Sequence, residues 1–186
     1  VDAYCSGKMA AEMLSFLTKE NPDVVIFVGN KDNDEHQIKI KGFIDEAKIK
    51  NLNIIGIYET HDDADIAYRL ANKVIGECDG VDGIYSATAN TASICDAVTE
   101  KNCSAKIVGT DLCEETVKYI KSGKAAPAIN ALIEVAGMKE INSTSIAFMI
   151  APRINAAGRM GDASLALELL LTDDQSRAKT LAEKLN

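Results

Sequence analysis

The sequence lacks tryptophan and is poor in aromatic residues, which make up 5% of its 186 residues. Proteins that grip single-stranded nucleic acid use aromatic side chains as stacking platforms. Basic residues are also in the minority, because 20 Lys and Arg stand against 28 Asp and Glu, a net charge of −8. An acidic surface repels phosphate backbones. We therefore expect no nucleic-acid partner.

Long apolar runs and paired cysteines are missing as well. No apolar run reaches the roughly 18 residues that a membrane-spanning helix requires, and no signal peptide is visible, so we expect no membrane partner. The five cysteines are odd in number and scattered. This pattern disfavours a disulfide framework, and the lack of a C-x-x-C pair disfavours structural zinc. We expect reduced cysteines and a cytoplasmic location.

The first two thirds of the chain alternate between short apolar runs and segments with helical spacing. The run "VVIFVG" is rich in β-branched residues, as is typical of a strand buried on both faces. Four strand-helix alternations with short connections predict an α/β fold, in which helices cover both faces of a parallel sheet in three layers. The predicted strands span residues 24–29, 53–58, 83–88 and 105–110.

The segments that follow these strands are polar: "GNKDND", "YETHDD", "ATANT" and "GTD". In parallel sheets, ligands bind at the carboxyl ends of the strands. None of the four segments has the glycine spacing of a phosphate-binding loop, so we expect no nucleotide cofactor. The "THDD" segment at 60–63 favours helix capping over a metal site. His36 and His61 are far apart in the sequence, and we expect no metal and no cofactor of any kind.

The pattern changes after Lys124. A short helix is expected around Pro127, and the apolar "SIAFMIAP" at 145–152 favours a fifth strand that adds to the sheet, with Phe148 in its core. Two helices follow, joined near Thr172, with Asp162 and either Thr172 or Asp173 as N-caps. The stripe formed by Leu165, Leu169 and Leu170 is expected to be core and to help cover the sheet. We thus divide the chain into residues 1–124 and an α-rich segment, 125–186, docked on the same sheet.

Residues 1–124 resemble the C-terminal lobe of the type I periplasmic sugar-binding proteins and LacI-type regulators. The resemblance lies in "VDAYCSGKMAAEML", "KIKGF", "YETHDDADIAYRLANKVI", "DGIYSATANTASICDAV" and "KIVGTDLCEETVKYIKSGK". It implies a flavodoxin-like topology and a small sugar as ligand, held by Lys39, Asn90 and Asp111. Amide, carboxylate and ammonium groups suit vicinal hydroxyls. The alternative is that Asn90 and Asp111 only form turns and that Lys39 is a solvated helix residue.

Two departures from that family weaken the implied sugar site. Lys39 stands where the family most often has arginine, and lysine cannot form the planar two-pronged hydrogen bond of a guanidinium. The family strand that follows "IKSGK" usually ends in a glutamine that completes the site, whereas this chain continues "AAPAINALIEVAG". The family also binds sugar between two lobes. We therefore expect at most half of a sugar cleft.

Residues 128–186 resemble the inter-domain segment of the RecJ family of single-strand-specific DNA exonucleases. The resemblance is carried by "APRINAAGRMGDA" and by "AKTLAEKLN". It implies weak nucleic-acid contact by Arg153, Asn155 and Arg159. The alternative is that these side chains support a turn containing Gly158 and Gly161. The Asp and His ligands of a D-H-H catalytic motif are missing from the sequence, so we expect no enzyme activity and no catalytic residue.

These two resemblances favour a chimera without intact natural activity, built on a lobe of the sugar-binding type. The first alternative is a residual carbohydrate-binding or sensor module. The second is a fragment of a RecJ-type exonuclease with weak nucleic-acid contact.

Overall fold

A computed structural model describes residues 2–77, 80–159 and 163–185. The chain divides into two compact units, Val1–Asp111 and Leu112–Asn186. Within the described ranges, no helix combines the length and the apolarity that a membrane crossing requires.

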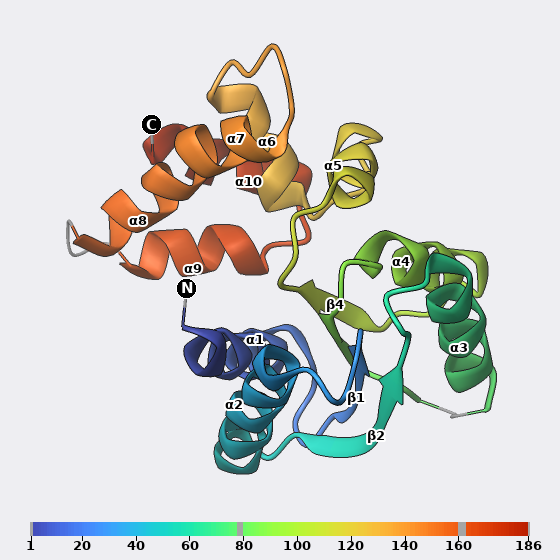
Figure 1. Cartoon of the computed structure of the whole chain (residues 1–186). Helices are drawn as coiled ribbons and strands as arrows, with labels where there is room; N and C mark the ends of the chain where they lie inside the picture. Colours follow the sequence, from blue (N-terminus) through green and yellow to red (C-terminus); the bar gives the residue numbers. More distant parts are fainter. Residues whose placement is uncertain (1, 78–79, 160–162, 186) are drawn as a thin grey trace. The chain divides into compact units, whose positions relative to one another are not determined.

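The first unit contains a four-stranded sheet with the strand order β2-β1-β3-β4, in which every pair is parallel (Figure 1). The predicted α/β fold and its four strands are confirmed. In chain order its elements are α1 (Ala3–Leu17), β1 (Asp23–Val28), α2 (Asp34–Lys50), β2 (Asn53–Glu59), α3 (Ala64–Glu77), β3 (Gly83–Ala87), α4 (Thr91–Glu100) and β4 (Lys106–Gly109).

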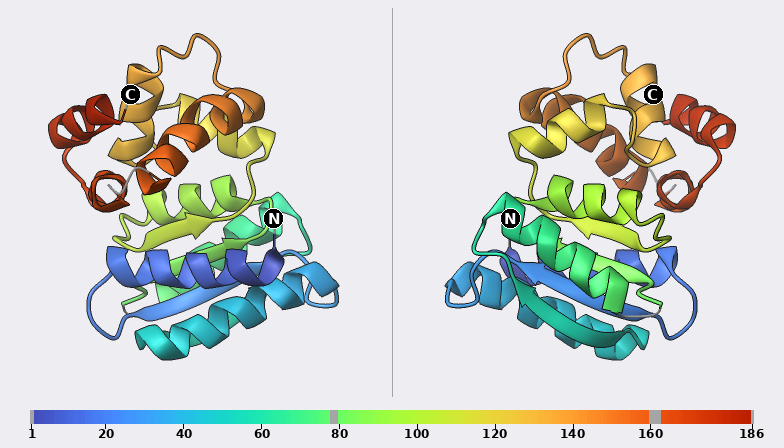
Figure 2. Two further views of the ribbon diagram at one scale, coloured as in Figure 1. Left: turned by 90° about the vertical axis from the view of Figure 1, so that its left-hand side faces the viewer. Right: turned by 90° about the vertical axis from the view of Figure 1, so that its right-hand side faces the viewer.

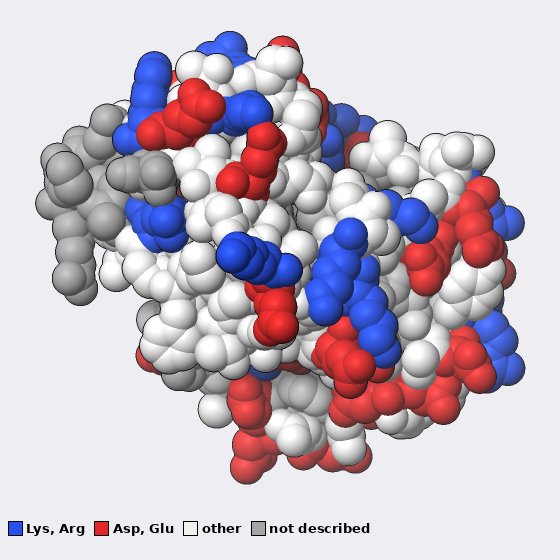
Figure 3. Space-filling model, turned by 90° about the horizontal axis from the view of Figure 1, so that it is seen from above, with Lys and Arg blue, Asp and Glu red and all other residues white. Residues whose placement is uncertain are grey.

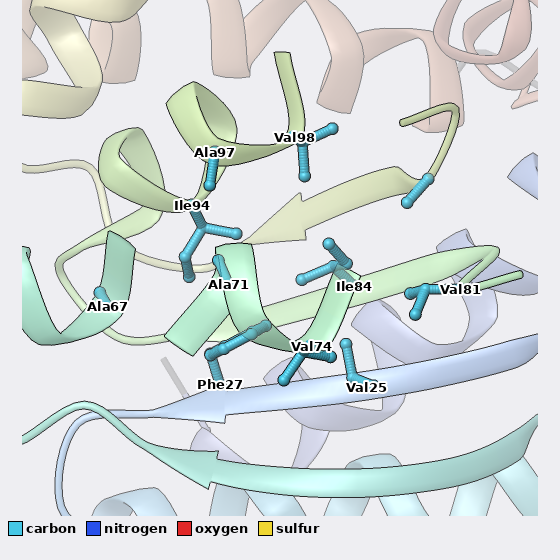
Figure 4. Close-up of a cluster of buried hydrophobic side chains, with 11 residues drawn as sticks. Val25, Phe27, Ala67, Ala71, Val74, Val81, Ile84, Ile94, Ala97 and Val98 are labelled. Atoms are coloured by element: carbon cyan, nitrogen blue, oxygen red, sulfur yellow. The ribbon is translucent and has the colours of Figure 1, made fainter. Parts of the chain in front are cut away.

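Helices cover both faces of this sheet, as the two views in Figure 2 show. Alternate residues of β1 point to opposite faces. Val24 and Ile26 pack with Leu14 of α1 and Phe43 of α2. Val25 and Phe27 enter the opposite cluster with residues of α3 and α4 (Figure 4). Because both faces of β1 are buried, its sequence is a continuous apolar run rather than an alternating one.

All the regular elements in the described part of the second unit are helices. Its elements are α5 (Glu114–Lys121), α6 (Pro127–Val135), α7 (Ser143–Ser145), the π-helix η1 (Ile146–Ile150), α8 (Ala151–Arg159), α9 (Ala163–Leu171) and α10 (Gln175–Lys184). Pro127 occupies the first turn of α6, as predicted. Leu169 is fully buried, and Leu165 and Leu170 pack against the same cluster, so the predicted core stripe is confirmed. These leucines pack in one cluster with residues of α6 and α10.

The predicted fifth strand is wrong, because "SIAFMIAP" is helical. Asn142 and Ser145 form a reciprocal capping box that starts a helical segment at Ser143. Ile146, Ile150 and Ile154 follow at four-residue spacing and all join the cluster of the second unit. Phe148, predicted to be core, is 76% exposed. A short apolar run fits either a buried strand or one face of a helix, and here the four-residue period decides.

The N-cap of the last helix also differs from the prediction. Asp174, rather than Thr172 or Asp173, caps α10 and accepts hydrogen bonds from the backbone N–H groups of Ser176 and Arg177, at 2.8 and 3.1 Å. Thr172 supports this turn, because its hydroxyl accepts a bond from the Asp174 backbone N–H. The other predicted N-cap, Asp162, lies outside the described residues.

Candidate functional site at the carboxyl edge of the sheet

The close crossing of α1 over α2 positions the first candidate residue. A Cβ on Gly42 would lie 2.1 Å from the carbonyl oxygen of Tyr4, and one on Gly7 would lie 1.9 Å from that of Lys39. Only glycine fits such an approach of two backbones. The glycine of "KIKGF" therefore allows the N-terminal turns of α1 to lie against α2 next to Lys39.

Lys39 is buried, with 7% of its surface exposed. Its ammonium lies 3.2 Å from Oε1 of Glu35, one turn earlier on α2, and 3.5 Å from Oδ1 of Asp111, which follows β4. A buried ammonium requires such charged partners. The structure thus brings two of the three predicted residues, Lys39 and Asp111, into contact, and Lys39 is not the solvated helix residue of the alternative interpretation.

A pocket of about 180 Å³ adjoins this ion pair. We call it the Lys39 pocket; it is lined by Ala3, Ser6, Glu35, Lys39, Thr110 and Asp111. All six residues belong to the first unit. Three charged side chains and two hydroxyls surround a small volume, which suits a polar ligand.

Two buried hydroxyls at this place have no hydrogen-bond partner among the described residues: those of Tyr85 and Thr110. The Tyr85 ring stacks on Phe43, with 4.7 Å between the centroids. Burial raises the pKa of Tyr85 to about 12; the nearby Thr110 hydroxyl opposes this rise and the Asp111 charge adds to it. Buried hydroxyls are normally satisfied, so this pair marks a polar spot in the core behind the Lys39 pocket.

Asn90, the third predicted residue, belongs to a second group, which we call the Thr88 network: Thr60, Asp62, Thr88 and Asn90. The Thr88 hydroxyl lies 3.0 Å from Oδ1 of Asp62 and 3.0 Å from Oδ1 of Asn90. It can donate to only one of them at a time. Thr60 lies 3.2 Å away and anchors the network through the carbonyl of Val28.

The backbone of the loop after β2 is unusual. His61 and Asp62 both have φ near +50°, in the left-handed region that non-glycine residues rarely adopt. This conformation places the Asp62 carboxylate where a Cβ on Gly29 would collide with it, at 2.0 Å. Asp63 accepts a hydrogen bond from the backbone N–H of Ile66, so the predicted capping role of "THDD" is confirmed at this residue.

Sequence reasoning missed Glu35, Tyr85 and the two threonines Thr60 and Thr88. Glu35 lies one helical turn before Lys39, a spacing that indicates an ion pair. The two threonines each follow a strand, beside residues that were singled out. Nothing in the sequence distinguishes Tyr85 from an ordinary core aromatic residue.

The residues implied by the RecJ resemblance, Arg153, Asn155 and Arg159, belong to helix α8. Arg153 is part of α8, and its guanidinium donates to the carbonyl of Met149, one turn earlier. Asn155 is exposed and two positions further on, so the two side chains point in different directions. Arg159 ends α8, but its side chain lies outside what the structure describes, as does Gly161.

Charge is distributed unequally between the two units. Residues 1–111 carry 11 basic and 19 acidic residues, whereas 112–186 carry 9 of each, so the first unit accounts for the whole net charge of −8. On the face drawn in Figure 3, basic and acidic side chains lie next to one another. No group of three or more His, Cys, Asp or Glu within the described ranges is arranged to hold a metal ion.

Two solved sugar-binding proteins share this fold. AraP, an arabinose binding protein from Geobacillus stearothermophilus, matches with a TM-score of 0.62 and 23% identity, over 68% of this chain and 44% of that chain. GanP, a glucose-galactose binding protein from the same organism, matches with a TM-score of 0.62 and 24% identity, over 68% and 46%. This chain spans less than half the length of either. These likenesses show the fold: an α/β lobe built on a parallel sheet.

The family follows from the sequence match. The family described as "Periplasmic binding protein domain" matches residues 1–133, which is more than half of the chain. The protein belongs to this family.

A second set of relatives matches a smaller part of the chain. The single-stranded-DNA-specific exonuclease RecJ of Escherichia coli (strain K12) is 41% identical over 69 residues, 36% of this chain and 12% of that protein. RecJ of Dickeya dadantii (strain 3937) is 38% identical over 77 residues, 40% of this chain and 13% of that protein. The chain thus spans about an eighth of the length of these relatives. Both resemblances noted in the sequence are present.

Proposed function

We propose that the first unit is a carbohydrate-recognition lobe that supplies one wall of a sugar site, with Lys39, Asn90 and Asp111 as contact residues. The observation that carries this proposal is the buried Lys39–Asp111 pair, 3.5 Å apart at the carboxyl edge of the sheet beside an open polar pocket. The printed names of structures with the same fold support the ligand class: they bind arabinose and glucose or galactose.

The chemistry of these groups suits a polyol. The Asp111 carboxylate accepts from sugar hydroxyls, the Lys39 ammonium donates to them, and the Asn90 amide does both. Because lysine presents a point charge rather than a planar fork, it orients neighbouring hydroxyls less strictly than arginine would. The two carboxylates near Lys39 fix its ammonium in place and offset part of that loss.

The isolated lobe binds weakly in this proposal. The chain spans less than half the length of the sugar-binding chains that it matches. A single wall leaves much of a sugar in water, whereas ligand sites usually bury most of their ligand. We expect dissociation constants in the millimolar range, equivalent to about −4 kcal/mol. We further propose that the chain is a chimera of this lobe with a RecJ-like segment and that it has no nuclease activity.

The test is a titration of the full chain with a panel of pentoses and hexoses, followed by NMR. We expect shifts of the backbone amides of Thr110 and Asp111 with at least one sugar. Lys39→Met and Asp111→Asn should each weaken binding about tenfold, the value of one charged hydrogen bond. The matched control is Lys73→Met, which removes an exposed lysine on α3. A panel without any shift at these amides contradicts the proposal.

Weak binding of single-stranded DNA is the second candidate function, and the identity to RecJ favours it. In this case Arg153 and Asn155 would contact phosphates. Affinity that falls steeply with added salt and drops further in Arg153→Ala would support it. Affinity independent of salt would exclude it.

A further inference from the structure

The Lys39 pocket has an excess of negative charge. Its lining contains two carboxylates, Glu35 and Asp111, and one ammonium, Lys39. Both carboxylates lie within 3.5 Å of that ammonium, so its charge is shared between them. Within the lining, one negative charge is left over. This sign determines which charged ligands the pocket accepts.

Of the two carboxylates in the lining, that of Glu35 is the more exposed and the better placed to contact a ligand. The Glu35 side chain is 67% exposed, against 33% for Asp111 and 9% for Lys39. Glu35 meets Lys39 through Oε1, and a carboxylate has about four acceptor sites, of which this contact uses one. Glu35 therefore keeps acceptor capacity on the solvent side of the pocket, while Lys39 lies behind it.

The surrounding chain adds to the negative field. Residues 1–111 carry eight more acidic than basic residues. Asp32 lies in the turn that leads into α2, and Asp34 is the first residue of the helix, directly before Glu35. The lysine of this turn, Lys31, is engaged elsewhere, because its ammonium donates to the carbonyl of Ile57 and its backbone N–H to Glu59. A ligand that approaches this edge meets more carboxylates than ammonium groups.

A second observation indicates that the pocket takes a polar ligand. The hydroxyls of Tyr85, which is 0% exposed, and of Thr110, which lines the pocket, have no hydrogen-bond partner within the described residues. Burial of unsatisfied hydroxyls costs free energy. A small rearrangement of Thr110 towards a hydroxyl-rich ligand would relieve this cost, which an apolar ligand could not do.

From this charge excess we infer that the Lys39 pocket prefers amino sugars to neutral sugars and rejects sugar acids. The inference rests on the proposed carbohydrate site and names its ligand class. A ligand ammonium that binds between Glu35 and Asp111 gives a neutral group of two carboxylates and two ammonium groups. A ligand carboxylate would raise the excess of negative charge in the lining from one to two, and like charges at this range repel.

The experiment compares three ligands of the same ring size with the full chain: 2-amino-2-deoxyglucose, glucose and glucuronic acid, at a pH that keeps the amine protonated. The galactose series covers the other configuration at C4. We expect the amino sugar to bind about tenfold more tightly than the neutral sugar, and the acid about tenfold more weakly. Added salt should narrow both differences.

Two variants assign the preference to the pocket. Glu35→Gln removes the left-over charge from an exposed side chain and should reduce the amino-sugar preference to less than about threefold. Glu77→Gln makes the same change at the end of α3, which leads to the opposite edge of the sheet, and should leave the preference unchanged.

The outcomes separate this inference from the proposed function. Equal binding of the amino and neutral sugars, lost in Lys39→Met, overturns the ligand class and keeps the sugar site. Tightest binding of the acid does the same. An amino-sugar preference that survives in Glu35→Gln also overturns the inference. No binding of any sugar overturns the proposed function together with it.

Discussion

The two units of this chain are organised by different periodicities. In the first unit, strands with both faces buried alternate with helices, and parallel pairing places all strand ends at one edge. In the second unit, the described residues form helices around a single cluster to which "SIAFMIAP" contributes Ile146 and Ile150. In the first unit, polar residues from distant parts of the sequence therefore lie together at the carboxyl edge of the sheet. In the second unit, the residues brought together from distant helices are apolar.

This difference explains where the net charge and the candidate sites lie. The whole net charge lies in the first unit, and so do the Lys39 pocket and the Thr88 network. A parallel sheet has a polar edge by construction, because loops at the carboxyl ends are exposed and close together. A helical cluster has no equivalent edge, and its charged side chains form separate pairs between helices, such as Arg177 with Glu168 and Lys179 with Glu134.

The largest expected effect tests the close helix crossing of the first unit. Gly42→Ala would place a Cβ 2.1 Å from the Tyr4 carbonyl, a backbone atom that cannot move aside easily. We expect a loss of about 3–5 kcal/mol in the free energy of unfolding of this unit. Hydrogen exchange resolved by residue should report the loss at Phe43 and Ile26 but not at Leu132 of the second unit.

The matched control for this variant is Gly76→Ala. Gly76 also lies inside a helix, but nothing lies within 4 Å of a Cβ built on it. This change should stabilise the first unit by up to about 1 kcal/mol, because alanine is the better helix former. If the two substitutions have the same effect, the crossing of α1 over α2 is not as close as described. If exchange at Leu132 rises with that at Phe43, the units do not unfold separately.

The sequence predicted secondary structure correctly where a segment fitted only one hydrophobic pattern, either that of a strand or that of a helix. Apolar runs bounded by turns identified β1 to β4, whereas Lys39 and Asp111, which the structure places 3.5 Å apart, were indicated only by the resemblance to sugar-binding lobes. The sequence-based prediction failed at Phe148, because six apolar residues in a row fit a strand as well as a helix, and only Asn142 and the spacing of the isoleucines decide between them. The left-handed conformation of Asp62 and the unpartnered Tyr85 hydroxyl depend on tertiary contacts, which no local pattern encodes.

The next prediction, of intermediate size, concerns the pH dependence of stability that the buried Tyr85 hydroxyl gives to the first unit. The pKa of Tyr85 is raised to about 12 from 10.0, mainly by burial. The folded state therefore binds the phenolic proton more tightly than the unfolded state. The stabilisation is fully present below pH 10 and is lost as the pH rises towards 12, by about 2–3 kcal/mol in total.

Urea unfolding of the wild type and of Tyr85→Phe, at pH 9 and at pH 11.5, measures this loss. The variant lacks the group that titrates, so its stability should fall less over this interval. Tyr4 and Tyr68, whose pKa values are raised by hydrogen bonds to Asp45 and Glu100, contribute equally to both proteins and cancel in the difference. At pH 9 the variant should be at least as stable as the wild type, because it lacks an unsatisfied buried hydroxyl. Equal slopes for the two proteins would mean that folding does not raise the pKa of Tyr85.

The smallest expected effect sharpens the comparison between strand and helix in the second unit. Phe148 is 76% exposed on the helical segment, so Phe148→Ala should change the free energy of unfolding by no more than about 0.5 kcal/mol. Leu169→Ala, at a fully buried position of the same unit, should cost about 2–5 kcal/mol. A fifth strand with Phe148 in a sheet core would give Phe148→Ala a cost comparable to that of Leu169→Ala. Denaturant unfolding of the two variants thus distinguishes the two structures of "SIAFMIAP", because only the helix leaves the larger side chain in water.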